Sequence, residues 1–237
     1  VFEGNKEKGL PSDEESARCW REEIGLPPDS VLYFSAKHNF WEMADIGPCG
    51  PCSEIHIDLG TSACDRKEMS GHKCQINSDC GRFVEMWNLV FIQFNRLADG
   101  SLKPLPEKHV DTGMGFERLV AVVQEKDSNY DTDLFSSILD EIICITGKEL
   151  DFKSGIPHRV IADHLRMLSF SLADGVMPGN EGRGYVLRRV LRRAARFGSK
   201  LEMKEPFIFK LVNSLCEVMG DAFPELNEKQ KHIEKVD

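Results

Sequence analysis

The stretch of residues 84–95 constrains the fold most strongly, because its side chains alternate along the chain and both alternating sets are largely apolar. One set contains Trp87, Leu89 and Phe91, and the other contains Asn88, Val90, Ile92 and Phe94. An alternation of period two is typical of a β-strand. A strand that is apolar on both sides is buried on both faces. We therefore expect a central strand over residues 84–95, covered on both sides.

The segments on either side of this strand predict further strands. Residues 54–59 alternate between apolar and polar side chains, and residues 102–110 follow a turn signal at Asp99 and Gly100. Turns rather than helices join these segments, which is typical of an antiparallel sheet.

Beyond residue 113 the apolar residues recur at helical spacing. We expect helices over residues 113–126, 132–146, 158–174, 184–197 and 205–219. The sequence therefore predicts an α+β fold, in which an antiparallel sheet flanked by helices is followed by an all-helical region. We place a domain boundary near residue 150, between residues 1–150 and residues 151–237.

Composition argues against two broad classes of protein. No run of about 18 apolar residues is present, so we expect no membrane span and no membrane partner. The net charge of -9 argues against a uniformly basic nucleic-acid-binding protein, although a local basic patch remains compatible with it. The chain begins at Val1 without a secretion signal, so we expect an intracellular fragment or processed chain with reduced thiols.

The stretch HVDTGMGFERL, residues 109–119, predicts a strand end, a tight glycine turn and then a helix. Gly113 lets the backbone turn sharply and lets a ligand come close. Asp111 before the turn can meet a small cation, whereas Arg118 inside the helix offers a planar fork of donors to a phosphate. The alternative is a helix cap at Asp111 or Thr112 and a solvated arginine.

Arginines are concentrated on the predicted helix 184–197. They are Arg188, Arg189, Arg192, Arg193 and Arg196. They share one stripe of the helix, and apolar side chains occupy another. Such a stripe in a chain of net negative charge predicts a phosphate-binding patch, and the alternative is a solvated face paired with nearby carboxylates.

A polar insertion between two expected strands contains four side chains of the kind that bind zinc. They are Cys64, His72, Cys74 and Cys80. Structural zinc takes four such ligands, but the spacing matches no common zinc motif, so ordinary reduced thiols remain the alternative. Cys49 and Cys52 in GPCGPC could compete as ligands, although we expect a rigid turn there.

Six stretches of the chain share their residues and their order with a known family of enzymes. They are NFWEMADIGPCGPCSEIH at residues 39–56, EMWNLVFIQFNR at 85–96, HVDTGMGFERL at 109–119, SNYDTDLF at 128–135, HRVIADH at 158–164 and NEGRGYVLRR at 180–189. Together they resemble the alanyl-tRNA synthetase family of class II aminoacyl-tRNA synthetases.

This resemblance implies part of a class II catalytic core over residues 1–150, and over residues 151–237 the start of a helical region that recognises the tRNA acceptor stem. It implies that the carboxylate of alanine attacks the α-phosphate of ATP with Mg²⁺ assistance, giving alanyl-adenylate and pyrophosphate. The alanyl group then passes to tRNA(Ala). The implied location is the cytoplasm, with the mitochondrial matrix as the alternative.

The resemblance also implies roles for individual residues. Asp111 is the expected anchor of the alanine ammonium group, and Arg118 matches the motif 3 arginine that holds the γ-phosphate of ATP. The rest of the alanine pocket is assigned to Trp41, Asn88, Val90 and Gly113. For Trp41 and Val90, ordinary core packing remains the alternative.

For tRNA, Asn180 matches the family's asparagine that helps read the G·U pair of the acceptor stem. The arginines expected beside it are Arg188, Arg189, Arg192 and Arg193. RNA presents a wide and shallow minor groove, so a short polar side chain in the loop before the basic helix can reach base edges there.

Two elements of the family pattern are not found in this sequence. Motif 1, and motif 2 with its α-phosphate arginine, should lie upstream, and residues 1–38 contain neither. We therefore expect an internal fragment of a longer synthetase that by itself lacks full activation chemistry. The competing interpretation is a non-catalytic module that binds the tRNA acceptor stem.

Overall fold

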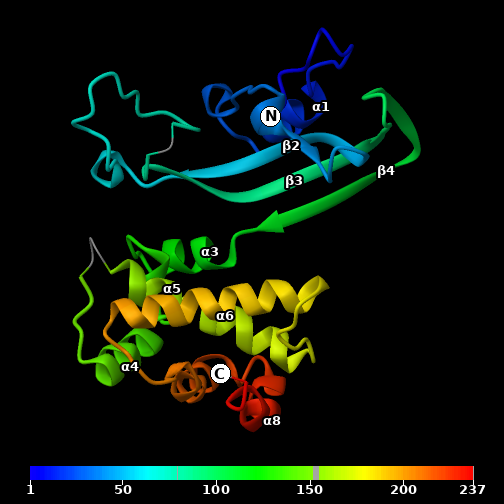
Figure 1. The fold of residues 1–237 in the computed structure, drawn as a ribbon. Coiled ribbons are helices and arrows are strands. Elements are labelled where there is room, and N and C mark those ends of the chain that lie inside the picture. The colour runs from blue at the N-terminus through cyan, green and yellow to red at the C-terminus, as the bar shows by residue number, and fades with distance from the viewer. Residues whose placement is uncertain (79, 152–154, 237) are drawn as a thin grey trace. The chain divides into compact units, whose positions relative to one another are not determined.

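A computed structural model describes residues 1–78, 80–151 and 155–236 of the chain. The chain forms two compact units, residues 1–119 and residues 120–237 (Figure 1). The predicted division near residue 150, between an aminoacylation part and a tRNA-recognition part, stays a prediction, because compactness alone does not assign function.

The first unit is built on a four-stranded sheet. Its strands are β1 (Phe40–Glu42), β2 (Gly47–Asp58), β3 (Phe83–Arg96) and β4 (Leu102–Met114). The strand order is β1-β2-β3-β4 and every neighbouring pair is antiparallel. The predicted α+β class, the antiparallel sheet and the central place of β3 among its neighbours are confirmed.

Short helical segments precede the sheet in the chain. They are α1 (Glu14–Arg18), the π-helical η1 (Cys19–Glu23), the 3-10 segment η2 (Pro28–Ser30) and α2 (Ala36–Asn39). Trp20 joins this N-terminal part to β2, because its Nε1 donates a hydrogen bond to Ser53 Oγ at 2.7 Å. A small apolar cluster of Val1, Ala17 and Val31 packs within it.

The expected coverage of β3 on both faces is wrong. Only Met86 and Val90 of this strand are buried, and the other side chains are half-buried. Nearly all of β4, which like β1 is an edge strand of the described sheet, is exposed. Apolar side chains on both faces show that a strand tolerates burial. Whether each face is actually buried depends on the elements that pack over it.

The glycine motif also folds differently from the expectation. β4 continues to Met114, so Asp111 and Gly113 lie inside the strand, and α3 begins only at Phe116 and ends at Val123. Gly113 pairs with Asn88 in the ladder, and its φ angle is not positive. Backbone pairing with β3 therefore extends the strand through a glycine that resembled a turn residue.

The GPCGPC segment is likewise a strand rather than a rigid turn, since it forms the first half of β2. The β2–β3 register shifts between Cys49 and Cys52. A Cβ atom added to Gly50 would lie 1.9 Å from the carbonyl oxygen of Phe91. The glycine is therefore required by the close approach of the β3 backbone.

The second unit is helical and contains one continuous apolar core. Its elements are the 3-10 segment η4 (Asn129–Asp131), α4 (Ser136–Thr146), α5 (Ile156–Ala173), α6 (Gly182–Lys200), the 3-10 segment η5 (Ile208–Leu211), α7 (Val212–Met219) and α8 (Pro224–Ile233). Buried side chains from α4 to α8 form this core, with Ile142, Ile161, Leu211 and Leu215 fully enclosed. The helix α8 was not predicted from the sequence, although Pro224 at its first turn is a helix-start signal.

In the described part of the chain, no helix combines the length and apolar character that crossing a bilayer requires.

Candidate functional site

Strand register brings most of the predicted alanine-site residues to one face of the sheet. Val90 of β3 pairs with Asp111 of β4, and Asn88 pairs with Gly113. Directly paired residues in an antiparallel sheet place their side chains on the same face. The four predicted positions therefore form a square on two neighbouring strands.

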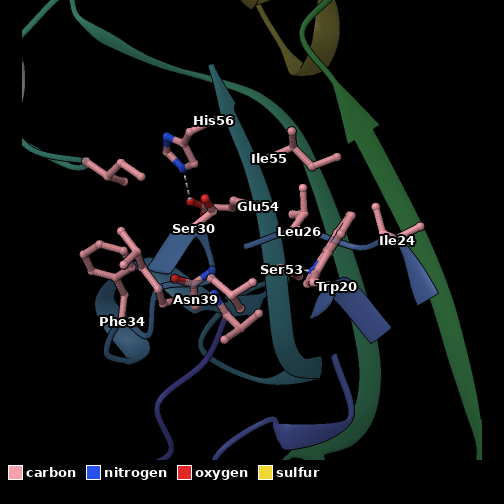
Figure 2. Close-up of a pocket in the computed structure, with 14 residues that line it drawn as sticks. Trp20, Ile24, Leu26, Ser30, Phe34, Asn39, Ser53, Glu54, Ile55 and His56 are labelled. Atoms are coloured by element: carbon pink, nitrogen blue, oxygen red, sulfur yellow. Dashed lines mark hydrogen bonds and ion pairs between the residues drawn. The ribbon is translucent and has the colours of Figure 1, made fainter. Parts of the chain in front are cut away.

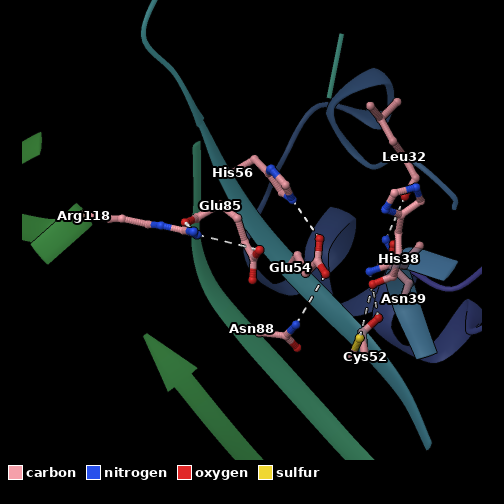
Figure 3. Close-up of polar contacts among 10 residues, drawn as sticks. Leu32, His38, Asn39, Cys52, Glu54, His56, Glu85, Asn88 and Arg118 are labelled. Atoms are coloured by element: carbon pink, nitrogen blue, oxygen red, sulfur yellow. Dashed lines mark hydrogen bonds and ion pairs between the residues drawn. The ribbon is translucent and has the colours of Figure 1, made fainter. Parts of the chain in front are cut away.

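The same face continues onto β2 through a polar network. Glu54 pairs with Asn88 in the register, and Asn88 Nδ2 donates to Glu54 Oε1 at 3.4 Å. His56 Nε2 lies 2.8 Å from Glu54 Oε2, and both of these side chains are about nine-tenths buried (Figure 3). The oxygen Oδ1 of Asn88 and the nitrogen Nδ1 of His56 are buried, and neither has a hydrogen-bond partner within the described part of the chain.

Sequence reasoning did not single out Glu54 and His56 as site residues. The available signal was the alternation of residues 54–59, which placed these two polar side chains on one side of a strand. Their burial could not be read from that alternation, because it depends on what packs over β2.

Asp111 is exposed and lightly engaged. Its Oδ1 accepts a hydrogen bond from the backbone nitrogen of Thr112 at 2.8 Å, and its Oδ2 has no hydrogen bond to any residue that the structure describes. A Cβ atom added to Gly113 would meet no atom within 4 Å, so the space beside Gly113 is open. The arrangement can present a carboxylate and an uncrowded backbone to a small ligand.

Arg118, on α3, contacts β3 at Glu85, away from the Val90–Asp111 pair. Its Nη1 donates to the backbone oxygen of Glu85 at 2.8 Å and lies 3.8 Å from the Glu85 carboxylate, with about half of the arginine side chain exposed. Glu85 and Val90 are five residues apart, which is roughly 16 Å along an extended strand. No described hydrogen bond or ion pair joins Arg118 to Asp111.

Trp41 lies on β1 and pairs with Gly50 of β2, so two strands separate it from Asp111 in the sheet order. Its side chain is half-buried. The register does not place Trp41 beside Asn88 or Val90, and its role as a wall of the alanine pocket stays a prediction.

A cavity of about 320 Å³ lies between the N-terminal segment and β2 (Figure 2). Its lining is mostly apolar and includes Trp20, Leu26 and Phe34, together with the polar Glu54 and His56. Asp111 and Arg118 do not line this cavity. The buried Glu54–His56 pair therefore belongs both to the lining of this cavity and to the polar network on β2 and β3.

The four predicted zinc ligands come together in space. The ligand atoms of Cys64, His72, Cys74 and Cys80 all lie within 4.8 Å of one another. Cys49 and Cys52, considered as competing ligands, are not members of this group. Cys52 instead donates a weak hydrogen bond from Sγ to His38 O at 3.8 Å. Burial raises the pKa of the Cys52 thiol to about 12.

The surroundings of this cluster favour thiolate at one position. The Ser78 hydroxyl, 3.3 Å away, is the main cause that lowers the pKa of Cys80 to about 6. Arg82 donates from Nε and Nη2 to the two carboxylate oxygens of Asp58 at 2.7 Å and 2.6 Å. These hydrogen bonds are the main cause that lowers the pKa of Asp58 to about 2.

The arginine stripe on α6 is exposed. Leu187, Ala194 and Gly198 form the buried side of the helix, and all five arginines, Arg188, Arg189, Arg192, Arg193 and Arg196, lie on its exposed surface. None of the five forms an ion pair with a residue that the structure describes. The alternative of a stripe paired with nearby carboxylates is therefore not what the structure shows.

Asn180 lies in the exposed loop before α6 and contacts this stripe. Its Oδ1 accepts a hydrogen bond from Arg188 Nη1. Gly179 N also donates to Gly184 O at 2.9 Å, which closes the loop on the start of the helix. In the residues that the structure describes, no hydrogen bond uses the side-chain nitrogen Nδ2 of Asn180, which lies beside this cationic surface.

Comparison with known proteins identifies the family of the chain. The family model described as tRNA synthetases class II (A) matches residues 7–236. The alanine–tRNA ligase of Chlorobium phaeobacteroides is 54% identical over 94% of the chain. Those of Bacteroides thetaiotaomicron and Salinibacter ruber are 51% and 48% identical over 100% and 99% of it.

The matched regions are 25%, 27% and 26% of these three relatives. The chain therefore spans about a quarter of the length of the curated relatives that it matches.

Proposed function

The chain belongs to the class II (A) family of tRNA synthetases, and from this premise we propose that it acts as part of an alanine–tRNA ligase. The proposed reaction joins alanine to ATP as alanyl-adenylate and then transfers the alanyl group to tRNA(Ala). The observation that carries the proposal is the strand register, which puts Asn88, Val90, Asp111 and Gly113 on one sheet face. The proposed location is the cytoplasm, with the mitochondrial matrix as the alternative.

In the proposed alanine site, the exposed carboxylate of Asp111 binds the ammonium group. Charge-assisted hydrogen bonds of this kind are roughly twice as strong as neutral ones. Asn88 Oδ1, which is buried and has no hydrogen-bond partner among the described residues, is the second acceptor proposed for this group. The buried Val90 contacts the methyl group, and the open space at Gly113 leaves room for the backbone of the substrate.

In the proposed nucleotide site, Arg118 binds the γ-phosphate of ATP. Its hydrogen bond to the Glu85 carbonyl orients the guanidinium, and its other donors remain for the phosphate. The separation along β3 fits a ligand whose amino acid end and triphosphate end lie apart. Mg²⁺ neutralises phosphate charge in such reactions, and the Glu85 carboxylate beside Arg118 is an oxygen ligand of the kind that Mg²⁺ prefers.

In the proposed tRNA site, the arginine stripe of α6 binds phosphates of the acceptor stem, and Asn180 reads base edges at the G·U pair. Lys and Arg contacts to phosphate position a protein on nucleic acid, whereas side chains that reach the bases supply sequence information. The proposal is supported by the exposure of these arginines, by the lack of ion pairs between them and any described carboxylate, and by the contact of Asn180 with Arg188.

The test compares two substitutions in the complete polypeptide that contains residues 1–237. Asp111→Asn should lower alanine-dependent ATP–pyrophosphate exchange by about 100-fold, because truncating one partner of a charge pair costs roughly 2–5 kcal/mol. Charging of tRNA(Ala) should fall with it. Asn180→Ala should lower charging while exchange stays at the wild-type rate.

Each substitution is thus the control for the other. Exchange that is unchanged in Asp111→Asn would contradict the assigned alanine site and favour the non-catalytic acceptor-stem module. Equal losses of exchange and charging in Asn180→Ala would contradict an RNA-reading role for the asparagine.

A further inference from the structure

In its described residues, 59–78 and 80–82, the insertion between β2 and β3 has almost no regular structure of its own. Apart from η3 (Thr61–Ala63), its backbone hydrogen bonds close short local turns, such as those from His72 N to Met69 O at 3.1 Å and from Ser78 N to Gln75 O at 3.2 Å. A long polar loop of this kind cannot bury enough apolar surface to offset the entropy of ordering it. Disulfides or metals commonly hold such segments.

Four side chains of the insertion converge in space. Cys74 Sγ lies 3.7 Å from Cys80 Sγ, and Cys64 Sγ lies 3.3 Å from His72 Nε2. In a tetrahedral zinc site with Zn–S near 2.3 Å, two sulfur ligands are separated by about 3.8 Å. The four ligand atoms, all within 4.8 Å of one another, need only small movements to reach that geometry.

Burial and charge also fit a metal. Cys64 and Cys80 are buried, while His72 and Cys74 are half-buried, so the cluster is largely shielded from water. Three thiolates and one neutral imidazole around Zn²⁺ would have a net charge of −1. Arg82 Nη1 lies 3.8 Å from Cys74 Sγ and supplies a compensating positive charge. Such outer partners orient metal ligands and support their charge.

We propose that Cys64, His72, Cys74 and Cys80 bind one structural Zn²⁺ ion, which fastens the insertion to the end of the sheet. The ligands occupy all four positions of a tetrahedron, which is typical of a structural rather than a catalytic zinc. Binding releases the protons of those thiols that are protonated.

Arg82 connects the metal site to the sheet. It contacts Cys74 on one side and binds both carboxylate oxygens of Asp58, the last residue of β2, on the other. Leu59 N donates to Arg82 O at 2.9 Å, and Gly81 N donates to Asp65 Oδ1 at 3.0 Å. The zinc therefore closes a loop whose two ends are already aligned.

The loop also forms part of the cavity wall. Ile76, between the ligands Cys74 and Cys80, lines the 320 Å³ cavity beside His56. Fixing both neighbouring ligands on one ion fixes the position of Ile76. The metal thus fixes the part of the cavity wall that Ile76 forms, without itself lining the cavity.

The first test measures metal content in the full chain purified without chelator. Elemental analysis should find one zinc per chain in the wild type and almost none in Cys74→Ser or His72→Ala. Cys144→Ser is the matched control, because it removes an exposed thiol on α4 outside the cluster. After exchange of the metal for Co²⁺, the wild type and this control should show thiolate-to-cobalt absorption, which the ligand variants lose.

The second test measures by limited proteolysis whether zinc holds the insertion in place. Removing zinc with a chelator should speed tryptic cleavage after Arg66, Lys67 and Lys73 in the insertion, and adding zinc back should reverse this, while cleavage in α6 keeps its rate. Substoichiometric zinc in the wild type, or a Cys74–Cys80 disulfide as the native form, would overturn the proposal. Stoichiometric zinc with unchanged cleavage would overturn the fastening role.

Discussion

The two units of this chain place their polar and apolar groups in opposite ways. In the helical unit, apolar side chains from α4 to α8 form one enclosed core, and the charged groups assigned to tRNA lie outside on α6. In the sheet unit, the strands are only partly covered, and the Glu54–His56 pair and the Oδ1 atom of Asn88 are buried within it.

The difference teaches how each proposed site is supported. Exposed arginines can be placed on α6 because the opposite side of that helix already packs into an apolar core. The sheet face instead combines ligand binding with support, since Val90 is both buried and paired with Asp111. We therefore expect stability and function to separate cleanly in the helical unit and less cleanly in the sheet.

The largest expected effect is on the helical core. Leu215 is fully buried, so Leu215→Ala should lower the free energy of unfolding of this unit by about 2–5 kcal/mol. Val110 on β4 is 73% exposed, and Val110→Ala should change stability by less than about 0.5 kcal/mol. Urea denaturation of the two variants and the wild type checks both values.

The chain allows the two units to be followed separately. All three tryptophans, Trp20, Trp41 and Trp87, lie in residues 1–119. Tryptophan fluorescence therefore reports on the sheet unit, while circular dichroism reports mainly on the helices. Leu215→Ala should lower the urea midpoint measured by circular dichroism and leave the fluorescence midpoint unchanged. An equal shift of the fluorescence midpoint would contradict the separation of the two units, because it would show that they unfold together.

An intermediate effect is expected within the sheet from two glycines. Gly50→Ala should destabilise the chain by about 1–3 kcal/mol or more, because its Cβ would meet the Phe91 oxygen at 1.9 Å. Gly113→Ala should leave stability unchanged, since its Cβ enters open space, but it should raise KM for alanine in pyrophosphate exchange. A wild-type KM in folded Gly113→Ala would place the substrate elsewhere.

The smallest expected effect on stability is at the arginine stripe. Arg192→Gln should leave the melting temperature unchanged, because the side chain is exposed and without an ion pair in the described structure. It should weaken binding of an acceptor-stem RNA and reduce the salt dependence of log K by about 1. Lys231→Gln, which removes an exposed charge on α8, is the control. An equal loss of RNA binding in this control would show that the overall charge of the chain, and not the arginine stripe, determines the affinity.

Much of the fold could be predicted because it depends on local pattern. The period of two in residues 84–95 identified β3, and helical spacing identified α4 to α7, since each reports which side of an element faces apolar surroundings. The prediction of a turn at the glycine motif was wrong because the local pattern did not decide the structure there. Gly113 has the same local signal in a turn and in a strand, and pairing with Asn88 decided between them.

The sequence alone determined β3, the helices α4 to α7, the antiparallel connection of the strands, the arginine stripe and the identity of four side chains of the kind that bind metal. Tertiary structure decided which of these groups meet. Register set Val90 beside Asp111, Glu54 became buried against His56, and the ligands of the insertion converged. The physical reason is that alternation and helical spacing are properties of neighbours along the chain, whereas register, burial and ligand convergence depend on segments far apart in it.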